Sequence, residues 1–468
     1  MMSRAATAVT ALLLGVSLLT APAAGARPAT PAPSPGQAHT TTPITHFVFM
    51  LQGDRSFDNY FGTYPGADGI PAETCQKRIV TGPATGCVKP FPLHSKVPPM
   101  LGAGAEELHK QYDNGAMDGF VAAYQDEGRD GTNTMGYYDQ RDLPTYWDLA
   151  ARYVLFDHFF SSTNDGVRAN RSYWVAGKTA PAGGPQQLNA AYSEEPTIFD
   201  RLQAANISWK FYVQGYDPNQ TFRTNSRTNP TTQPVRVPLL NYARFVDNPA
   251  LNAHITDMSQ YDKDLDAGTL PAVAYVASSG PSERSARSIA SGQKLVSDLV
   301  GSLMVSKYWD SSAFLLSYDG SGGWYDHVKP PQVDRNGYGM RVPALLVSPY
   351  ARLGHIENTV MDYTSALAFI EKNWQLAPLA TRDAAANSIA PAFDFHASPR
   401  LPQVNFGQPV AAKSPLVSVA LVYFCYGAAL LLVLGLVLFA IAAPAWRRRR
   451  DNAGEPAVRE AEPVGAQR

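Results

Sequence analysis

An apolar segment that runs straight into a polar turn constrains the fold of this chain more than any other feature. The segment extends from His46 to Pro71 and reads HFVFMLQGDRSFDNYFGTYPGADGIP. Phe47–Leu51 is typical of a buried strand, and a tight turn and a Gly/Pro/aromatic loop follow at once. In α/β proteins the residues after the carboxyl end of such a strand often carry the chemistry. The segment therefore predicts an α/β fold with chemistry at the end of this strand.

Strand-like and helix-like segments alternate along the chain after this segment. Such alternation predicts an α/β sandwich with a mostly parallel central sheet. The predicted strands are Phe47–Leu51, Tyr153–Phe156, Trp209–Val213, Ala272–Val276, Ala313–Tyr318 and Ala344–Val347, and the predicted helices are Thr145–Ala151, Thr197–Ala205, Gly292–Tyr308 and Tyr363–Asn373. Asp217–Asp257 is rich in Asn, Thr, Arg and Pro, which predicts an excursion or cap outside the core sheet.

The two ends of the chain predict export and attachment to a membrane. Residues 1–26 combine Arg4, an apolar run and small residues at the end, which is typical of a signal peptide. Val417–Ala443 is almost purely apolar and long enough to cross a bilayer, and Arg447–Arg450 follow it closely. Since positive charge stays on the cytoplasmic side, the body is predicted to lie outside the cell membrane and the tail inside.

These features divide the chain into consecutive parts. We expect a signal peptide at 1–26, a linker at 27–43, the main domain at 44–397, a stalk at 398–415, a single transmembrane helix at 417–443 and a cytoplasmic tail at 447–468. The linker and the stalk are expected from their Pro-rich composition. The formal net charge of -1 gives no electrostatic basis for a nucleic-acid partner.

The chain has three cysteines. Cys75 and Cys87 enclose a short Gly/Pro/Thr loop, and we predict a disulfide between them because the predicted compartment is oxidising. Cys425 lies in the predicted membrane span.

Several blocks of sequence occur in the order found in a known family. Besides QGDRSFDNYFG at Gln52–Gly62, they include NGAMDGFV at Asn114–Val121, YDGSGGWYDHVKPP at Tyr318–Pro331 and RVPALLVSPYAR at Arg341–Arg352. On these blocks the chain resembles the bacterial phosphoesterase family, which contains phosphatidylcholine-type phospholipases C and an acid phosphatase. The resemblance implies the fold of alkaline phosphatases and sulfatases, and an activity on phosphoester bonds.

The resemblance also implies that chemical positions of the family are replaced in this chain. Gly53 stands where the family carries a metal-binding Glu, Val167 where it carries a nucleophilic Ser or Thr, and Gly320 where it carries a second metal-binding acid. Phosphoester hydrolysis of this kind needs an activated oxygen nucleophile and a metal ion. Glycine and valine supply neither a ligand atom nor an attacking oxygen, so no residue is assigned as catalytic with certainty.

Other polar residues of the same blocks are retained. Candidate metal or pocket residues are Asp54, Asp319 and Asp362, and candidate phosphate-binding or structural residues are Asn170, Arg171 and His327. Asp54 is equally well explained as a polar turn residue. Arg171 suits either a phosphate contact or a structural ion pair. His327 is also explained as a packed, hydrogen-bonded histidine of a Gly-rich turn.

These observations leave three hypotheses. The first is a cell-surface member of the family that has lost most or all activity, needs no cofactor, and binds a phosphoester-like or phospholipid-like ligand. The second is an active hydrolase whose divalent metal and nucleophile come from Asp54, Asp319, Asp362 and a hydroxyl of Ser161, Ser162 or Thr163. The third is a structural protein of the envelope. The joint replacement of several chemical positions favours the first.

Overall fold

The computed structural model describes residues 39–78, 86–94, 98, 100–102, 104–179, 190–226, 231–278, 283, 288–407 and 419–452. The predicted signal peptide at 1–26, the linker up to residue 38, the stalk from residue 408 and the tail beyond residue 452 lie outside these residues.

The main domain is built on an eight-stranded sheet with the strand order β12-β6-β11-β10-β1-β9-β7-β8. Its strands are β1 (His46–Gln52), β6 (Val154–Phe156), β7 (Trp209–Val213), β8 (Ile255–Asp257), β9 (Val273–Ala277), β10 (Ser312–Tyr318), β11 (Ala344–Val347) and β12 (His355–Glu357). β11 is antiparallel to β10 and β6, and the other neighbouring pairs are parallel. The predicted α/β class is confirmed, while the sheet is mixed because of β11.

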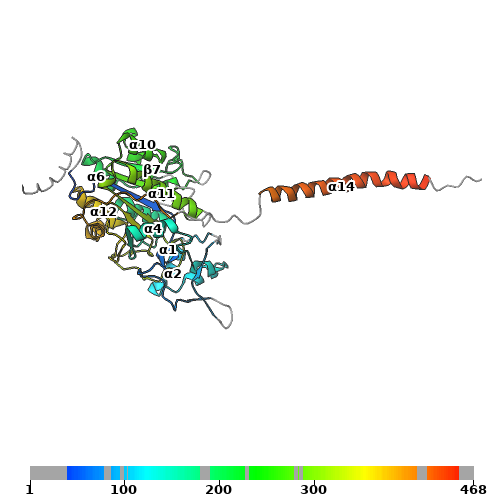
Figure 1. Ribbon diagram of the computed structural model, residues 1–468, viewed down its shortest axis with the longest axis horizontal. Helices are drawn as coiled ribbons and strands as arrows, with labels where there is room; N and C mark the ends of the chain where they lie inside the picture. Colours follow the sequence, from blue (N-terminus) through cyan, green and yellow to red (C-terminus); the bar gives the residue numbers. More distant parts are fainter. Residues whose placement is uncertain are drawn as a thin grey trace, which may run out of the picture.

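Helices cover both faces of this sheet (Figure 1). The α-helices of the domain are α1 (Phe57–Phe61), α2 (Ala105–Tyr112), α3 (Phe120–Gln125), α4 (Pro144–Arg152), α5 (Val167–Ala176), α6 (Ile198–Ala204), α7 (Gln233–Arg236), α8 (Ala243–Val246), α9 (Pro249–Asn252), α10 (Ser259–Ala267), α11 (Ile289–Val305), α12 (Tyr363–Asn373) and α13 (Thr381–Ala385). Phe47 and Phe49 of β1 contact Phe369 of α12 and Trp174 of α5 on one face. On the other face, Tyr212 of β7 contacts Tyr261 of α10.

Short pieces complete the domain. The 3-10 helices are η1 (Asp113–Gly115), η2 (Gly131–Met135), η3 (Pro238–Asn241), η5 (Trp309–Ser311) and η6 (Ala390–Ala392), and two small sheets pair β2 (Gln76–Lys77) with β3 (Cys87–Val88) and β4 (Phe91–Pro92) with β5 (Gly136–Tyr137). Cys75 and Cys87 form a disulfide beside β2 and β3, with Cα atoms 5.5 Å apart.

Local sequence explains where the central elements begin and end. Every residue of β1 and β10 is buried, as expected for strands covered by helices on both faces. Ser56 caps α1 by accepting a hydrogen bond from the backbone N–H of Asn59. Asp362 and Ser365 form a capping box at the start of α12. The polar residues that follow β1 and precede α12 are thus fixed by the backbone they cap.

Each predicted strand and helix has a counterpart in the structure, and two edge strands were not predicted. β8 and β12 contain only three residues each, with mixed polarity. The prediction that Asp217–Asp257 lies outside the core sheet is wrong for its last three residues, which form edge strand β8. The segment expected to begin the stalk packs on the domain, because Phe406 is buried in the core and Arg400 bonds to the carbonyl oxygen of Ala351.

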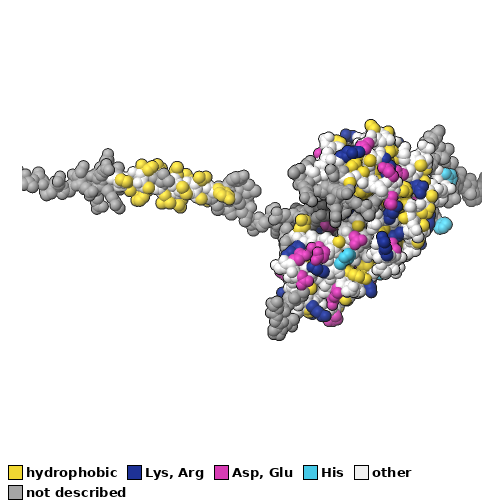
Figure 2. Space-filling view, turned by 180° about the vertical axis from the view of Figure 1, so that it is seen from behind, with side chains coloured by type: hydrophobic (Ala, Val, Ile, Leu, Met, Phe, Trp, Pro, Cys, Tyr) yellow, Lys and Arg dark blue, Asp and Glu magenta, His cyan; other side chains and the backbone are white. Residues whose placement is uncertain are grey.

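Helix α14 (Val419–Asn452) differs from every helix of the domain. Its segment Tyr426–Pro444 is long and apolar enough to cross a membrane by length and composition. Figure 2 shows apolar side chains along the visible face of this helix. The consecutive residues Leu430–Leu434 are apolar and exposed, so they point to every side of the helix, whereas a helix lying on a domain has an apolar stripe on one side.

Candidate functional site

The two central strands bring the predicted site residues to one edge of the sheet. β1 and β10 are parallel neighbours with Gln52 opposite Tyr318, so the residues that follow them emerge side by side. The backbone N–H of Asp54 donates to Asp319 Oδ1 at 3.2 Å, and Asp54 has a left-handed φ of 34°. A Cβ at Gly322 would lie 2.5 Å from the Cβ of Asp54. Gly322, whose φ is 65°, is therefore required for the close approach of the two turns.

Arg171 neutralises Asp319 inside the domain. Its Nε and one terminal nitrogen both lie 2.7 Å from Asp319 Oδ2, and both side chains are 2% exposed. The other terminal nitrogen donates to the carbonyl oxygen of Arg236 at 2.7 Å. Both carboxylate oxygens of Asp319 thus accept hydrogen bonds from the protein, one from Arg171 and one from the backbone of Asp54. Of the two roles predicted for Arg171, this geometry is that of a structural ion pair.

A small cavity lies between these turns and the start of α5, and we call it the strand-end pocket. Its volume is about 10 Å³, which is about the room that one water molecule needs. It is lined by Asp54, Leu108, Ser161, Asn164, Gly166, Val167, Asn170, Gly320, Ser321 and Gly322. Asn170 accepts a hydrogen bond from the backbone N–H of Thr163 at 3.0 Å. Asp54, Val167, Asn170 and Gly320 therefore line one cavity, while Gly53 precedes Asp54 in the same buried turn.

Asp362 lies at the N-terminus of α12 and is not among the residues that line the strand-end pocket. Ser162 donates to Asp362 Oδ2 at 2.7 Å, the hydroxyl of Thr364 donates to Oδ1, and Arg382 lies 3.6 Å from Oδ2. Burial raises the pKa of Asp362, although Arg382 and the hydroxyl groups oppose that shift. Asp362 therefore acts as a helix cap and hydrogen-bond acceptor in this structure.

The residues present do not fit the metal ion that the resemblance implies. A hard divalent cation takes six or more oxygen ligands, whereas Gly53 and Gly320 supply none from a side chain. Asp319 is already bonded to Arg171, whose guanidinium places a positive charge beside the pocket. The cavity of about 10 Å³ also leaves no space for an ion with bound water.

His327 lies outside the strand-end pocket, in a group of charged residues that we call the histidine cluster. The cluster consists of Asp58, Asp68, Asp157, His158, Asp326, His327 and Arg341. His327 Nδ1 lies 2.8 Å from Asp58 Oδ2, and Arg341 donates to Asp326 Oδ1 at 2.8 Å. Sequence reasoning missed this cluster, although the two Asp-His pairs at 157–158 and 326–327 were a visible signal.

A buried carboxyl group near Asp54 was also missed. The hydroxyl groups of Tyr60, Tyr146 and Tyr318 all donate to the carboxyl of Glu283, and Arg55 donates to its backbone oxygen. Burial raises the pKa of Glu283 to about 7, while the tyrosine hydrogen bonds lower it. No spacing in the sequence points to this group, because its members are scattered along the chain.

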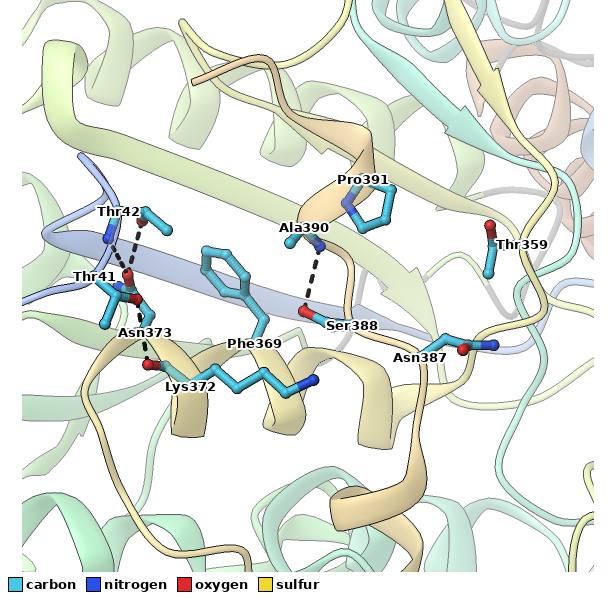
Figure 3. A pocket seen from close by; sticks show the side chains of 10 residues that line it. All are labelled: Thr41, Thr42, Thr359, Phe369, Lys372, Asn373, Asn387, Ser388, Ala390 and Pro391. Atoms are coloured by element: carbon cyan, nitrogen blue, oxygen red, sulfur yellow. Dashed lines mark hydrogen bonds between the residues drawn. The ribbon is translucent and has the colours of Figure 1, made fainter. Parts of the chain in front are cut away.

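A larger cavity of about 400 Å³ runs along α12, away from this chemistry (Figure 3). Its lining residues are Thr41, Thr42, Thr359, Phe369, Lys372, Asn373, Asn387, Ser388, Ala390 and Pro391. Thr42 donates to Asn373 Oδ1 at 2.7 Å, as Figure 3 shows. These ten residues include no carboxylate, histidine or cysteine, so size alone does not make this cavity a catalytic site.

The strand order and the charged turns after β1 and β10 define an α/β protein with its candidate site at the edge of a central sheet. Residues 44–377 match the model of the phosphoesterase family, and the chain belongs to that family. The family predicted from the sequence blocks is thereby confirmed.

Three curated relatives are phospholipases C. Phospholipase C A of Mycobacterium tuberculosis is 28% identical over 442 residues, which cover 82% of this chain and 83% of the relative. Non-specific phospholipase C6 of Arabidopsis thaliana is 26% identical, with 83% and 80% covered. The hemolytic phospholipase C of Pseudomonas aeruginosa is 25% identical, with 76% of this chain and 56% of the relative covered.

Two solved structures also match parts of this chain, with low structural similarity. The lipoteichoic acid synthase LtaP from Listeria monocytogenes has a TM-score of 0.37 at 6% identity, with 75% of this chain and 80% of that chain covered. The phosphonate monoester hydrolase of Agrobacterium radiobacter has a TM-score of 0.36 at 9% identity, with 71% and 74% covered.

Proposed function

We propose that this chain is a membrane-anchored member of the phosphoesterase family that has lost most or all phosphoesterase activity. The observation that carries the proposal is the ion pair between Arg171 and Asp319 beside a cavity of about 10 Å³. In an active site of this type a metal ion would hold and activate the nucleophile. Here a guanidinium neutralises the Asp319 carboxylate, and Val167 supplies no nucleophile.

The nucleophile and the metal ligands of a phosphoesterase act as a unit. Each 1.4 kcal/mol of lost transition-state stabilisation lowers the rate about tenfold. Removing one member of a catalytic unit therefore already lowers the rate by orders of magnitude. Gly53, Val167 and Gly320 replace three such members together. Turnover close to the uncatalysed background is the expected result.

The active alternative has one observation in its favour. Ser162 donates to Asp362 at 2.7 Å, which is the distance expected between a nucleophile and its base. Both residues are fully buried, however, and Asp362 is already bonded to Thr364. A substrate has no access to the Ser162 hydroxyl in this arrangement, so the pair suits a structural role better than a catalytic one.

A hydrolysis assay on the purified full chain separates the two proposals. Phosphatidylcholine and p-nitrophenyl phosphorylcholine are suitable substrates, assayed with added divalent ions and with a chelator. We expect no turnover above background under either condition and no change with Ser162→Ala. Chelator-sensitive turnover that Asp319→Ala abolishes would establish the active alternative instead.

Ligand binding without turnover is the second part of the proposal. A phospholipid-like headgroup is the ligand class we infer, because the relatives are named phospholipases C. Calorimetric titration of the full chain with phosphorylcholine should show saturable binding, and this binding should persist when a chelator is present. If millimolar phosphorylcholine gives no binding heat, the proposed ligand binding is wrong. The proposed loss of activity does not depend on that result.

We further propose that α14 anchors the chain in the cell membrane with the main domain outside. The apolar length of Tyr426–Pro444 and the arginines that follow it support this orientation. Protease added to intact cells should digest the domain and spare the segment after α14. Protection of the domain would contradict the proposed orientation.

A further inference from the structure

The last residues of the main domain run across its surface from one end of the sheet strands to the other. We call Arg400–Gly407 the strap. The strand-end side of the domain is the side at which β1 and β10 end, and the strand-start side is the side at which they begin. The first residue of the strap is bonded on the strand-start side and its last residue on the strand-end side.

Arg400 fixes the first end of the strap where the strands start. Its guanidinium donates to the carbonyl oxygens of Ala351 and Arg152 at 2.7 and 2.9 Å, and it lies over the ring of Tyr153. Its own carbonyl oxygen accepts a hydrogen bond from Trp309 Nε1 at 2.7 Å. Tyr153 directly precedes β6, and Trp309 begins the 3-10 helix that leads into β10. Because β6 and β10 are both antiparallel to β11, they begin on the same side of the sheet.

Gly407 fixes the other end of the strap where the strands end. Thr145, at the start of α4, donates its hydroxyl to the carbonyl oxygen of Gly407 at 2.7 Å. The next residue, Tyr146, and the last residue of β10, Tyr318, both donate to the carboxyl group of Glu283. The start of α4 therefore lies level with the end of β10, and Gly407 lies there too.

The strap is held closely against the domain at this end. The N–H of Gly407 donates to Asp148 Oδ2 at 3.2 Å. A Cβ at position 407 would lie 2.8 Å from the carbonyl oxygen of Pro144, so glycine allows the close approach of the two chains. Phe406 is 6% exposed and packs in the core. The chain therefore leaves the domain after Gly407, on the strand-end side.

Only a short piece of chain separates the strap from the proposed membrane anchor. Residues 408–418, eleven in all, lie between Gly407 and Val419, where α14 begins. A fully extended chain of this length spans about 40 Å at most. A domain of the size of residues 39–407 is about 50 Å across. If the strand-start side faced the bilayer, the connection would have to pass along the whole depth of the domain, which is longer than its reach.

We propose that the strap holds the strand-end side of the domain toward the bilayer in which α14 is anchored. The turns after β1 and β10 then face the lipid headgroups of that same membrane. This orientation rests on the proposed membrane anchor and does not depend on whether the strand-end pocket is active. A stalk that began at residue 398, as the composition predicts, would leave the domain on the strand-start side and would turn the pocket away from the membrane.

Two exposed positions at the two ends of α4 form a matched pair for a test. The side chain of Arg141 is 71% exposed and lies three residues before Pro144, where α4 starts. Leu353 is 72% exposed. The next residue is Gly354, at which a Cβ would lie 2.9 Å from the carbonyl oxygen of Ala151 near the end of α4. The two positions therefore differ in the side of the domain and not in exposure.

Energy transfer from a dye on the domain to dye-labelled lipids measures the orientation. The full chain with Cys425→Ser is reconstituted in vesicles that carry an acceptor dye on their headgroups. A donor dye that does not cross membranes is attached at Arg141→Cys or at Leu353→Cys, and the disulfide between Cys75 and Cys87 leaves no other free thiol. The rate of energy transfer should be at least twofold higher from Arg141→Cys than from Leu353→Cys.

Two variants check that the strap and the short connection cause this difference. A long Gly/Ser insertion after residue 408 leaves the strap in place, and it should shrink the difference because the chain then reaches farther. Phe406→Asp should detach the end of the strap, since an unpaired charge is not kept in the core. The difference should shrink in this variant as well, while circular dichroism shows that the domain keeps its fold.

Flotation of the vesicles separates the two ways in which the proposal can fail. A chain that floats with the vesicles but transfers energy equally from both positions, or faster from Leu353→Cys, overturns the proposed orientation and leaves the anchor standing. A difference that is unchanged by the Gly/Ser insertion overturns the role of the short connection. A chain that does not float with the vesicles shows that α14 is not an anchor, and the orientation is then wrong together with it.

Discussion

The strand-end pocket and the histidine cluster share three chain segments. The segments 54–58, 157–163 and 319–327 each contribute to the pocket or its wall at one end and to the cluster at the other. At the pocket Gly53, Val167 and Gly320 carry no ionisable side chain, whereas every member of the cluster is ionisable and bonded. The fold therefore does not require the chemistry of the pocket, while the cluster joins the three segments by ion pairs.

The largest expected effect is on stability when the cation of the cluster is removed. Arg341 is fully buried and pairs with Asp326 and Asp58, so Arg341→Met leaves two buried carboxylates without their cation. Breaking a buried ion pair on one side costs about 3–5 kcal/mol. Urea denaturation of the full chain, monitored by tryptophan fluorescence, should show that the free energy of unfolding falls by this amount.

Arg171→Met in the pocket should lower the free energy of unfolding by less. It leaves one carboxylate, Asp319, without its cation, and Asp319 keeps the hydrogen bond from the backbone of Asp54. The control is Arg141→Ala, because Arg141 is exposed. This substitution should change the midpoint of urea unfolding little. If Arg171→Met destabilises the chain as much as Arg341→Met does, the pocket contributes as much to stability as the cluster.

The next effect concerns the missing ligands of the pocket. A Cβ at Gly320 would lie 3.9 Å from both Asn170 Nδ2 and Asp54 Oδ1, so a side chain there begins in ordinary contact. Gly53→Glu, Val167→Thr and Gly320→Glu together should create a divalent-ion site, because ligands bind an ion cooperatively. We expect at least hundredfold tighter Mn²⁺ binding than in any single variant, measured by calorimetry. Equal affinity in a single variant and the triple variant would reject this cooperativity.

The sequence predicted the family and the central elements because buried strands and capped helices are encoded locally. The edge strands β8 and β12 were missed because three residues of mixed polarity become a strand only beside a partner. The direction of β11 was not predictable either, since an apolar run reads the same in both directions. Arg171 and Asp319 were both singled out, but their pairing joins positions 148 residues apart and needed the fold. The ion pairs of Asp68 with His158 and His327 were not predictable for the same reason, because the three residues are far apart in the sequence.

The smallest expected effect is the pH dependence of stability that Glu283 causes. The carboxyl of Glu283 is kept buried in a third way. Asp319 is neutralised by Arg171 and Asp326 by Arg341, whereas the carboxyl of Glu283 is held by three tyrosine hydroxyls. Its pKa of about 7 in the folded chain lies above the value of about 4.3 in an unfolded chain.

Between these two pH values the folded chain holds a proton that the unfolded chain has released, so rising pH destabilises the fold until about pH 7 and not beyond. Glu283→Gln stays neutral and should lose this dependence. From pH 5.5 to 7.5 the free energy of unfolding of the wild type should fall by about 2 kcal/mol more than that of the variant. The exposed Glu106→Gln serves as the control and should follow the wild type. If the free energy of unfolding of Glu283→Gln and of the wild type changes with pH in parallel, the carboxyl of Glu283 is ionised in the fold. The three tyrosine hydroxyls then stabilise its charge as well as the two arginines stabilise the charges of Asp319 and Asp326.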